Sequence, residues 1–149
     1  MGHTCNSIVI NAPYDLVFDI SNDIERWTEL FGGEYKEAKV LSREGNKITF
    51  QLTDDEGNSW QSFRLLFKDY NFAYAQKKEP TFPFKWMKII WLYTPTEAGI
   101  RMTWIQDFAM DEKAKFNDEQ VEGFINKHSQ DNLKIFKRVI EEEASKARV

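Results

Sequence analysis

The chain has 149 residues and a formal net charge of −4, and 42% of its residues are hydrophobic and 30% charged. We therefore expect one soluble domain over residues 1–149. The acidic balance argues against a general nucleic-acid binder, and no apolar run approaches the roughly 20 residues that cross a bilayer. Cys5 is the only cysteine, which excludes an internal disulfide, and residues 1–11 show no export signal. Both features predict a cytoplasmic location.

The predicted elements begin with a short strand at residues 7–11, followed by two short helices. Pro13 starts the first helix, because proline is tolerated in a first helical turn. Asn22 and Asp23 are expected to cap the second helix, which runs through Leu30. The N-terminal part of the chain is therefore read as strand, helix, helix.

Six further strands follow, separated by short turns that are rich in glycine, asparagine and acidic residues. They are predicted at residues 35–42, 47–53, 59–67, 71–78, 84–93 and 100–110. Residues 116–145 carry apolar positions at helical spacing and predict one long amphipathic helix. Short turns between consecutive strands indicate an antiparallel sheet, and a large sheet curls. The pattern thus predicts an α+β fold, with a curved seven-stranded antiparallel sheet around the C-terminal helix and an internal cavity.

Five segments of the chain resemble the single-domain aromatase/cyclases of bacterial aromatic polyketide pathways. They are NSIVINAPYDLVFDISNDIERWTELF at 6–31, WQSFR at 60–64, PFKWMKIIWLY at 83–93, MTWIQDF at 102–108 and DNLKIFKRVIEE at 131–142. The opening segment is shared by the wider START-like, lipid-transfer-like superfamily, whereas the five together are more specific. The resemblance covers nearly the whole chain and implies a helix-grip fold.

The resemblance implies a substrate and a reaction. The substrate would be an unreduced poly-β-ketone, held as a thioester on an acyl carrier protein that works with polyketide synthase components. The protein would promote the first aldol ring closure at a defined carbon pair and the dehydration that makes the ring aromatic. No metal and no organic cofactor is implied.

The resemblance also implies roles for individual residues. Arg64, Tyr35 and Ser62 are implied as catalytic, and Asn132 as a helix residue that faces the pocket. The other implied substrate-binding residues are Trp27 near the mouth, Trp60, Met87, Trp91, Trp104 and Gln106.

The chain departs from the family pattern at two places. Asn58 stands where the family often has a second tryptophan, and Lys77 or Lys78 stands where it has an arginine. We expect these differences to change the shape of the cavity, and with it the choice of carbon pair.

The strand at 59–67 can be oriented in two ways. Trp60, Ser62 and Arg64 share one face, and Phe63 belongs to the other. Hydrophobicity alone turns the Phe63 face inward and leaves Arg64 in water, because arginine is rarely buried. The resemblance turns Arg64 inward and leaves the Phe63 face to pack beneath the short helices or elsewhere. An inward guanidinium has a chemical purpose, since aldol closure passes through an enolate whose negative oxygen such a donor stabilises.

Other candidate residues also have two interpretations. Tyr35 either supplies or accepts a proton, or carries its hydroxyl at the rim. His128, Ser129 and Asn132 interrupt the apolar stripe of the long helix, where a ligand, a strand side chain or a water can satisfy them. A lone helical histidine such as His128 is more often structural or exposed than a base.

The densest basic cluster, Lys77, Lys78, Lys85 and Lys88, flanks the loop at residues 80–84. It is our candidate docking site for an acidic carrier protein, although lysines on edge strands also protect against aggregation. Strict alternation gives Lys85 the face of Met87.

Three function classes remain after this reading. A cyclase is the leading hypothesis, a non-catalytic carrier of lipids or other hydrophobic ligands is the alternative, and a stress-response or chaperone-type relative is the third. The chain has no glycine-rich phosphate loop, no metal-ligand spacing and no nucleophile elbow.

Overall fold

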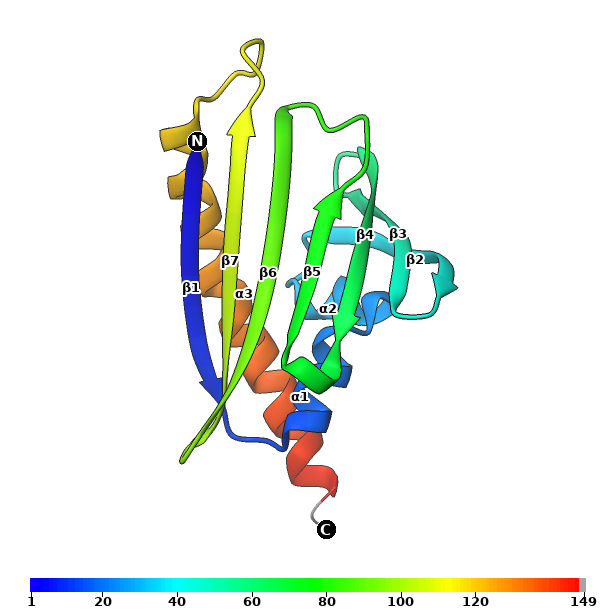
Figure 1. Cartoon of the computed structure of the whole chain (residues 1–149), viewed down its shortest axis with the longest axis vertical. Coiled ribbons are helices and arrows are strands. Elements are labelled where there is room, and N and C mark those ends of the chain that lie inside the picture. Colours follow the sequence, from blue (N-terminus) through cyan, green and yellow to red (C-terminus); the bar gives the residue numbers. More distant parts are fainter. Residues whose placement is uncertain (148–149) are drawn as a thin grey trace.

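The computed structural model describes residues 1–147 as one curved sheet and a long helix that crosses its concave side (Figure 1). The strands are β1 (Gly2–Ile10), β2 (Tyr35–Glu44), β3 (Lys47–Asp54), β4 (Ser59–Phe67), β5 (Phe72–Lys77), β6 (Phe84–Thr96) and β7 (Gly99–Met110). The helices are α1 (Tyr14–Ser21), η1 (Ile24–Arg26), α2 (Trp27–Leu30), η2 (Lys68–Tyr70) and α3 (Asp118–Ala147).

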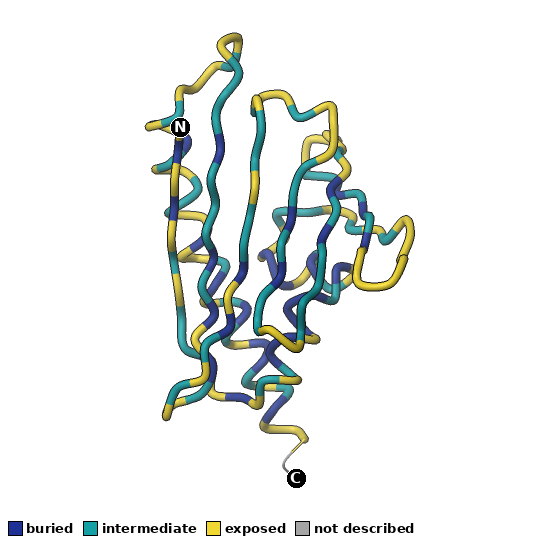
Figure 2. Tube along the Cα trace, viewed as in Figure 1, coloured by how far each residue is buried: buried dark blue, intermediate teal, exposed yellow. Residues whose placement is uncertain are grey.

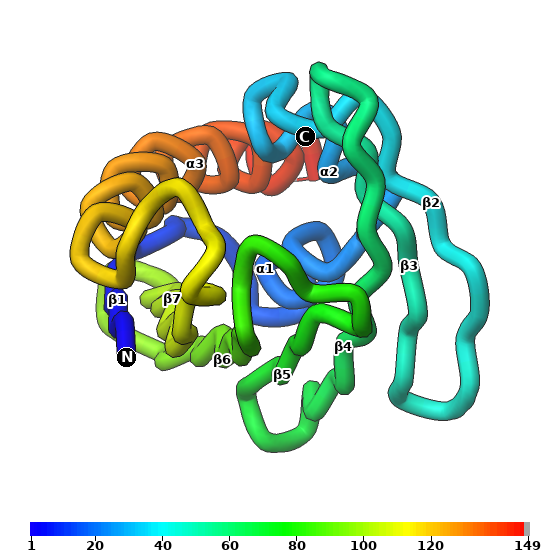
Figure 3. Tube along the Cα trace, turned by 90° about the horizontal axis from the view of Figure 1, so that it is seen from above, coloured from blue at the N-terminus to red at the C-terminus, as the bar shows by residue number. Residues whose placement is uncertain are grey.

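The sheet is seven-stranded and antiparallel, in the order β1-β7-β6-β5-β4-β3-β2. Seen from above, it bends from β1 round to β2, while α3 and α2 lie across the open side (Figure 3). The predicted seven strands, long C-terminal helix and two short helices between the first two strands are confirmed.

Two local predictions were wrong. The first strand begins at Gly2 rather than residue 7, and pairs with β7 along its whole length. The side chains of Asn22 and Asp23 do not cap the second helix. Asn22 is buried instead, and its amide nitrogen donates to the carbonyl of Phe18 and the hydroxyl of Tyr93. An asparagine that binds a buried network is no longer free to cap a helix.

The orientation of β4 follows the resemblance and not hydrophobicity. Ser62 and Arg64 are buried on the concave side, while Phe63 is only half-buried on the convex side. On that side, aromatic rings cover one another across β4 and β5: Phe63 packs on Tyr74, and Phe67 stacks on Phe72. The outer face is therefore covered by these rings and is only partly buried, and reading it as the core face was wrong.

The closed core occupies one end of the fold. Buried stretches gather toward the end where α1, α2 and the C-terminal half of α3 meet the sheet (Figure 2). Its members include Ile10, Phe18, Ile24 and Ile140. The other end is less tightly filled, which leaves room for a cavity. No helix within residues 1–147 is long and apolar enough to span a membrane.

Candidate functional site

A cavity of about 400 Å³ lies between the concave face of the sheet and α3. Its walls come from α2, the segment before β2, strands β2 to β7, and α3. All the residues implied from sequence line it: Trp27, Tyr35, Trp60, Ser62, Arg64, Met87, Trp91, Trp104, Gln106 and Asn132. Their catalytic and binding roles remain predictions.

Arg64 is the central charged group of the cavity. It is 2% exposed, and its Nε and Nη2 both donate to Oδ1 of Asn22, at 3.2 and 3.0 Å. The guanidinium carbon lies 4.2 Å from the ring centre of Trp91 and 5.2 Å from that of Trp27. Within residues 1–147 no carboxylate pairs with Arg64 and Nη1 has no hydrogen-bond partner. The structure thus holds a buried cation whose charge is not neutralised.

Burial lowers the pKa of Arg64 to about 10. A group with that pKa is still protonated at neutral pH, so the cavity carries a permanent positive charge. The neutral amide of Asn22 orients the guanidinium without cancelling the charge, whereas a carboxylate would have neutralised it. An anionic oxygen in the cavity would be strongly attracted to this group.

Asn22 belongs to a buried network that fixes Arg64 in place. Tyr93 shares a hydrogen bond of 2.7 Å with Ser21 and accepts one of 3.0 Å from Asn22. Burial raises the pKa of Tyr93 to about 12, against the opposing effect of Arg64. Tyr93 therefore stays neutral, and the network adds no anion beside Arg64.

Tyr35 lies in the cavity wall with its ring against Phe31 and Trp60, at centroid distances of 5.1 and 5.9 Å. Burial raises the pKa of its hydroxyl well above the usual range, and the neighbouring Glu34 carboxylate raises it further. The phenol is therefore protonated at neutral pH. It can donate a proton or hydrogen bond, but it is not a base in the resting protein.

The deep part of the cavity is an aromatic wall. Trp91 and Trp104 stack in contact, with ring centres 4.5 Å apart and planes 13° from parallel, and the ring of Phe136 on α3 packs edge-on against both. Trp27, expected near the mouth, is 4% exposed and packs on Phe50 and Trp91, so that placement was wrong. It lies in the helix that follows the buried residue Ile24. A flat ligand can pack against such a wall, although none fits between the two stacked rings.

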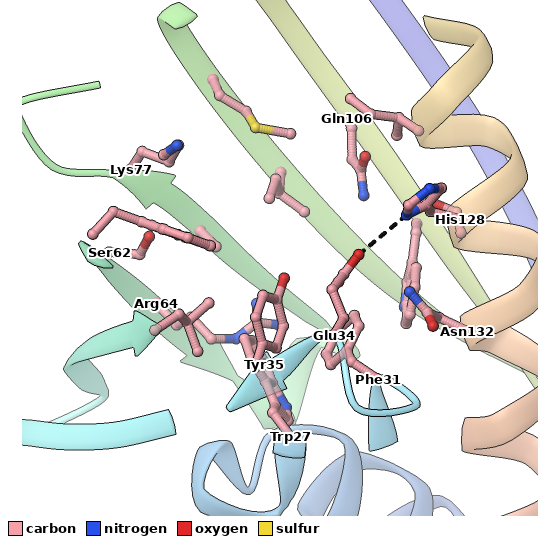
Figure 4. A pocket seen from close by; sticks show the side chains of 18 of the residues that line it. Trp27, Phe31, Glu34, Tyr35, Ser62, Arg64, Lys77, Gln106, His128 and Asn132 are labelled. Carbon is pink, nitrogen blue, oxygen red and sulfur yellow. Dashed lines mark hydrogen bonds and ion pairs between the residues drawn. The ribbon is translucent and has the colours of Figure 1, made fainter. Parts of the chain in front are cut away.

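Sequence reasoning missed an acid–imidazole pair that also lines the cavity. Oε1 of Glu34 lies 3.1 Å from Nδ1 of His128, joining the segment before β2 to α3 (Figure 4). The His128 side chain is 63% exposed, so the pair lies where the cavity meets solvent. Gly32 and Gly33 both have positive φ and turn the chain so that Glu34 reaches α3. The double glycine after a short helix was the available signal.

The basic cluster does not lie on one face. Lys77 lines the cavity, whereas Lys78, Lys85 and Lys88 are exposed. The predicted shared face of Lys85 and Met87 was wrong, because a register shift between residues 84 and 86 of β6 inserts one residue. Phe84 takes the inward position instead and lines the cavity with Met87.

Comparison with known proteins places the chain in a family. A family model described as polyketide cyclase/dehydrase and lipid transport matches residues 1–141. The chain belongs to this family. A protein of Streptomyces cyaneus named as a polyketide cyclase is 44% identical over 146 residues, 95% of each chain. One of Streptomyces halstedii, with the same name, is 47% identical over 109 residues, 70% of this chain and 98% of the relative.

Solved structures show the same fold. The Zhui aromatase/cyclase from Streptomyces sp. R1128 matches with a TM-score of 0.82 and 18% identity over 93% of each chain. A STAR-related lipid transfer protein from Xanthomonas axonopodis matches with a TM-score of 0.75 and 10% identity, over 93% of this chain and 85% of that one. The fold is therefore common to proteins named for cyclisation and for lipid transfer, and the residues of the cavity must decide between them.

Proposed function

We propose that the protein is a polyketide aromatase/cyclase that closes and aromatises the first ring of a carrier-bound, unreduced poly-β-ketone. One observation carries the proposal: the cation of Arg64 is buried in the cavity wall without a counter-charge, against the face of the stacked Trp91–Trp104 pair. Burying such a charge in a largely apolar wall costs free energy. That cost is explained if an oxyanion forms beside the cation during the reaction. The curated relatives named as polyketide cyclases support the same substrate class.

Ring closure would begin when a methylene carbon between two carbonyls gives a proton to the Glu34–His128 pair, which passes it to solvent, and becomes an enolate. Arg64 would hold the enolate oxygen, which lowers the free energy of the charged intermediate. The enolate carbon then bonds to a ketone carbon further along the chain, and the ketone oxygen becomes an alkoxide. Tyr35, protonated because burial raises its pKa, is suited to donate a proton to that oxygen.

Dehydration then gives the aromatic ring. A second methylene proton is lost, the new hydroxyl leaves as water with a proton, and a double bond forms in the ring. Glu34 and His128 are the acid–base pair of the wall nearest to solvent, and we assign to them the exchange of these protons with water. Ser62, Gln106 and Asn132 would orient the ketone oxygens that do not react.

A carrier of lipids is the alternative that the fold allows. Such a protein needs an apolar cavity that matches an alkyl chain, and an uncompensated arginine would lower its affinity for that chain. The polar groups in the cavity wall, Arg64, Ser62, Gln106 and Asn132, favour a ligand with several carbonyl oxygens. The stacked tryptophans favour one that becomes flat.

An acyl carrier protein is the partner that this proposal needs, because a free poly-β-ketone would react before it found the cavity. The exposed lysines Lys85 and Lys88, on β6, are the proposed docking groups. The proposal includes a cytoplasmic location, where polyketide synthase components would supply the substrate.

Reconstitution tests the function. The protein is added to a minimal synthase that makes an unreduced poly-β-ketone, and the products are identified by mass spectrometry and NMR. We expect one aromatic regioisomer to replace the mixture of spontaneously cyclised products. An unchanged mixture, with the substrate merely bound, would instead assign the protein to the ligand carriers.

A further inference from the structure

Lys77 is an ammonium group inside the cavity that the proposed mechanism has not used. It is the last residue of β5 and its side chain lines the cavity. Its Nζ lies 5.1 Å from the ring centre of Trp60 and 4.9 Å from that of Phe84, and both rings also line the cavity. Among residues 1–147, Lys77 has no carboxylate partner, because none of the ion pairs includes it.

The register of the sheet places Lys77 next to the catalytic wall. Its pairing partner across β4 is Ser62, and the partner of Arg64 is Ala75, two residues earlier on β5. Arg64 and Lys77 are therefore diagonal neighbours on one face, with Cα atoms about 7 Å apart. Figure 4 shows Ser62 between them, on the wall opposite His128 and Asn132.

Two cations at this spacing fit the chemistry of an aldol closure. The negative charge starts on the enolate oxygen and ends on the oxygen of the ketone that is attacked, so two oxygens need stabilisation in turn. Both cations arise from one wall, from backbone positions about 7 Å apart, so ketone oxygens spaced along one poly-β-ketone chain can contact each of them. One cation alone would stabilise only the start or the end of the step.

We propose that Lys77 forms a second oxyanion site, which holds the oxygen of the attacked ketone while Arg64 holds the enolate oxygen. The inference rests on the proposed function, and it adds that both ends of the first ring are anchored. In the bond-forming step the enolate carbon attacks the ketone carbon, the carbonyl π electrons move to oxygen, and the resulting alkoxide is held by the ammonium group. The anchor pair would also restrict which carbon pair can meet.

The physical state of Lys77 agrees with this role. Burial lowers its pKa, which means that the charged form has lost water without gaining an anion. An incoming oxyanion would restore that lost stabilisation. The two aromatic faces hold the ammonium in position without neutralising it.

A flat 1,3-diketone, naphthoylacetone, tests the site directly because its enol and enolate absorb at different wavelengths. We would measure the enolate fraction of the bound probe at neutral pH in the wild-type protein and in Lys77→Met and Lys77→Arg. A nearby cation shifts an acidic pKa by about one unit or more, so Lys77→Met should lower the enolate-to-enol ratio about tenfold. Lys77→Arg, which keeps the charge, should retain most of the wild-type ratio.

Lys47→Met is the matched control, because the ammonium of Lys47 lies 5.0 Å from the ring centre of Phe63 on the convex side of the sheet. It should leave the ratio unchanged. A wild-type ratio equal to that of the free probe, or a ratio unaltered by Lys77→Met, would overturn the inference, as would an equal fall in the Lys47 variant. Cyclisation by the wild-type protein is scored separately, so failure of the second site and failure of the proposed function are distinguishable.

Discussion

Replacing Arg64 by methionine should separate catalysis from folding. The substitution removes the guanidinium and keeps a flexible apolar stem of similar length in the wall. In the structure, Nε and one N–H of Nη2 are committed to Asn22, so the two N–H groups of Nη1 and the second N–H of Nη2 are left for a substrate oxygen. Loss of one such donor typically lowers kcat by about 10²–10³, or about 3–4 kcal/mol of barrier.

The effect of Arg64→Met on stability should be much smaller than its effect on rate. The variant leaves Oδ1 of Asn22 without a partner, a loss of about 1–3 kcal/mol. It also removes a desolvated charge, which offsets part of that loss. The free energy of unfolding, measured in urea, should therefore fall by no more than about 2 kcal/mol.

Asn22→Ala should lower stability more than Arg64→Met does. Asn22 does not line the cavity, but it accepts both hydrogen bonds from Arg64. Its removal leaves a buried cation without a partner, and the free energy of unfolding should fall by up to about 1.5–3 kcal/mol for each of the two charged hydrogen bonds.

For Arg64→Met, the assay is the rate at which the regiospecific aromatic product forms from carrier-bound substrate. A folded Arg64→Met protein with wild-type rate and product would refute the oxyanion role of Arg64.

Three further outcomes follow from the same geometry. Tyr35→Phe should slow aromatic product formation about tenfold or more. The pH–rate profiles of wild type and variant should have the same shape between pH 6 and about 9, because the phenol of Tyr35 stays protonated throughout that range. An activity unchanged by this substitution would leave Tyr35 a packing residue. Titration with an aromatic polyketide should quench tryptophan fluorescence, and replacing both Trp91 and Trp104 should remove most of the quenching; persistence of the signal would place the ligand elsewhere. Lys85→Glu with Lys88→Glu should slow turnover of carrier-bound substrate, less so at high salt, and leave a small carrier-free thioester unaffected; equal losses on both substrates would indicate damage to the cavity.

The antiparallel run from β2 to β7 could be predicted because every connection between these strands is short and strands joined in this way pair with their neighbours. The long helix was equally evident from its apolar stripe. The start of β1 was missed because its outward residues, His3, Cys5 and Ser7, are exposed, and its inward residues Gly2 and Thr4 are buried without being strongly hydrophobic. An edge strand with a polar outer face gives a weak pattern.

The inward face of β4 could not be predicted from hydrophobicity. The face with Phe63 and Leu65 is the more apolar, yet it is the outer one, where rings cover each other across strands. Arg64 is buried because Asn22, 42 residues away in sequence, accepts its hydrogen bonds. Such a partner becomes visible only in three dimensions.

Local irregularities hid two other parts of the site. The bulge in β6 exchanges Lys85 for Phe84 on the inner face, and alternation carries no sign of an inserted residue. The Glu34–His128 pair joins residues that are 94 positions apart, so the sequence showed His128 only as a lone histidine and gave no sign of Glu34 as its partner. Both features depend on backbone geometry that residue types do not report.

The most direct test of the account is single-turnover kinetics on a short synthetic poly-β-ketone thioester, with ring formation followed by absorbance. We predict a saturable acceleration over the reaction without protein, one aromatic regioisomer, and loss of the acceleration in Arg64→Met. Tight binding of the thioester with no acceleration, or protection of the open chain from cyclisation, would contradict the account and identify the cavity as that of a carrier.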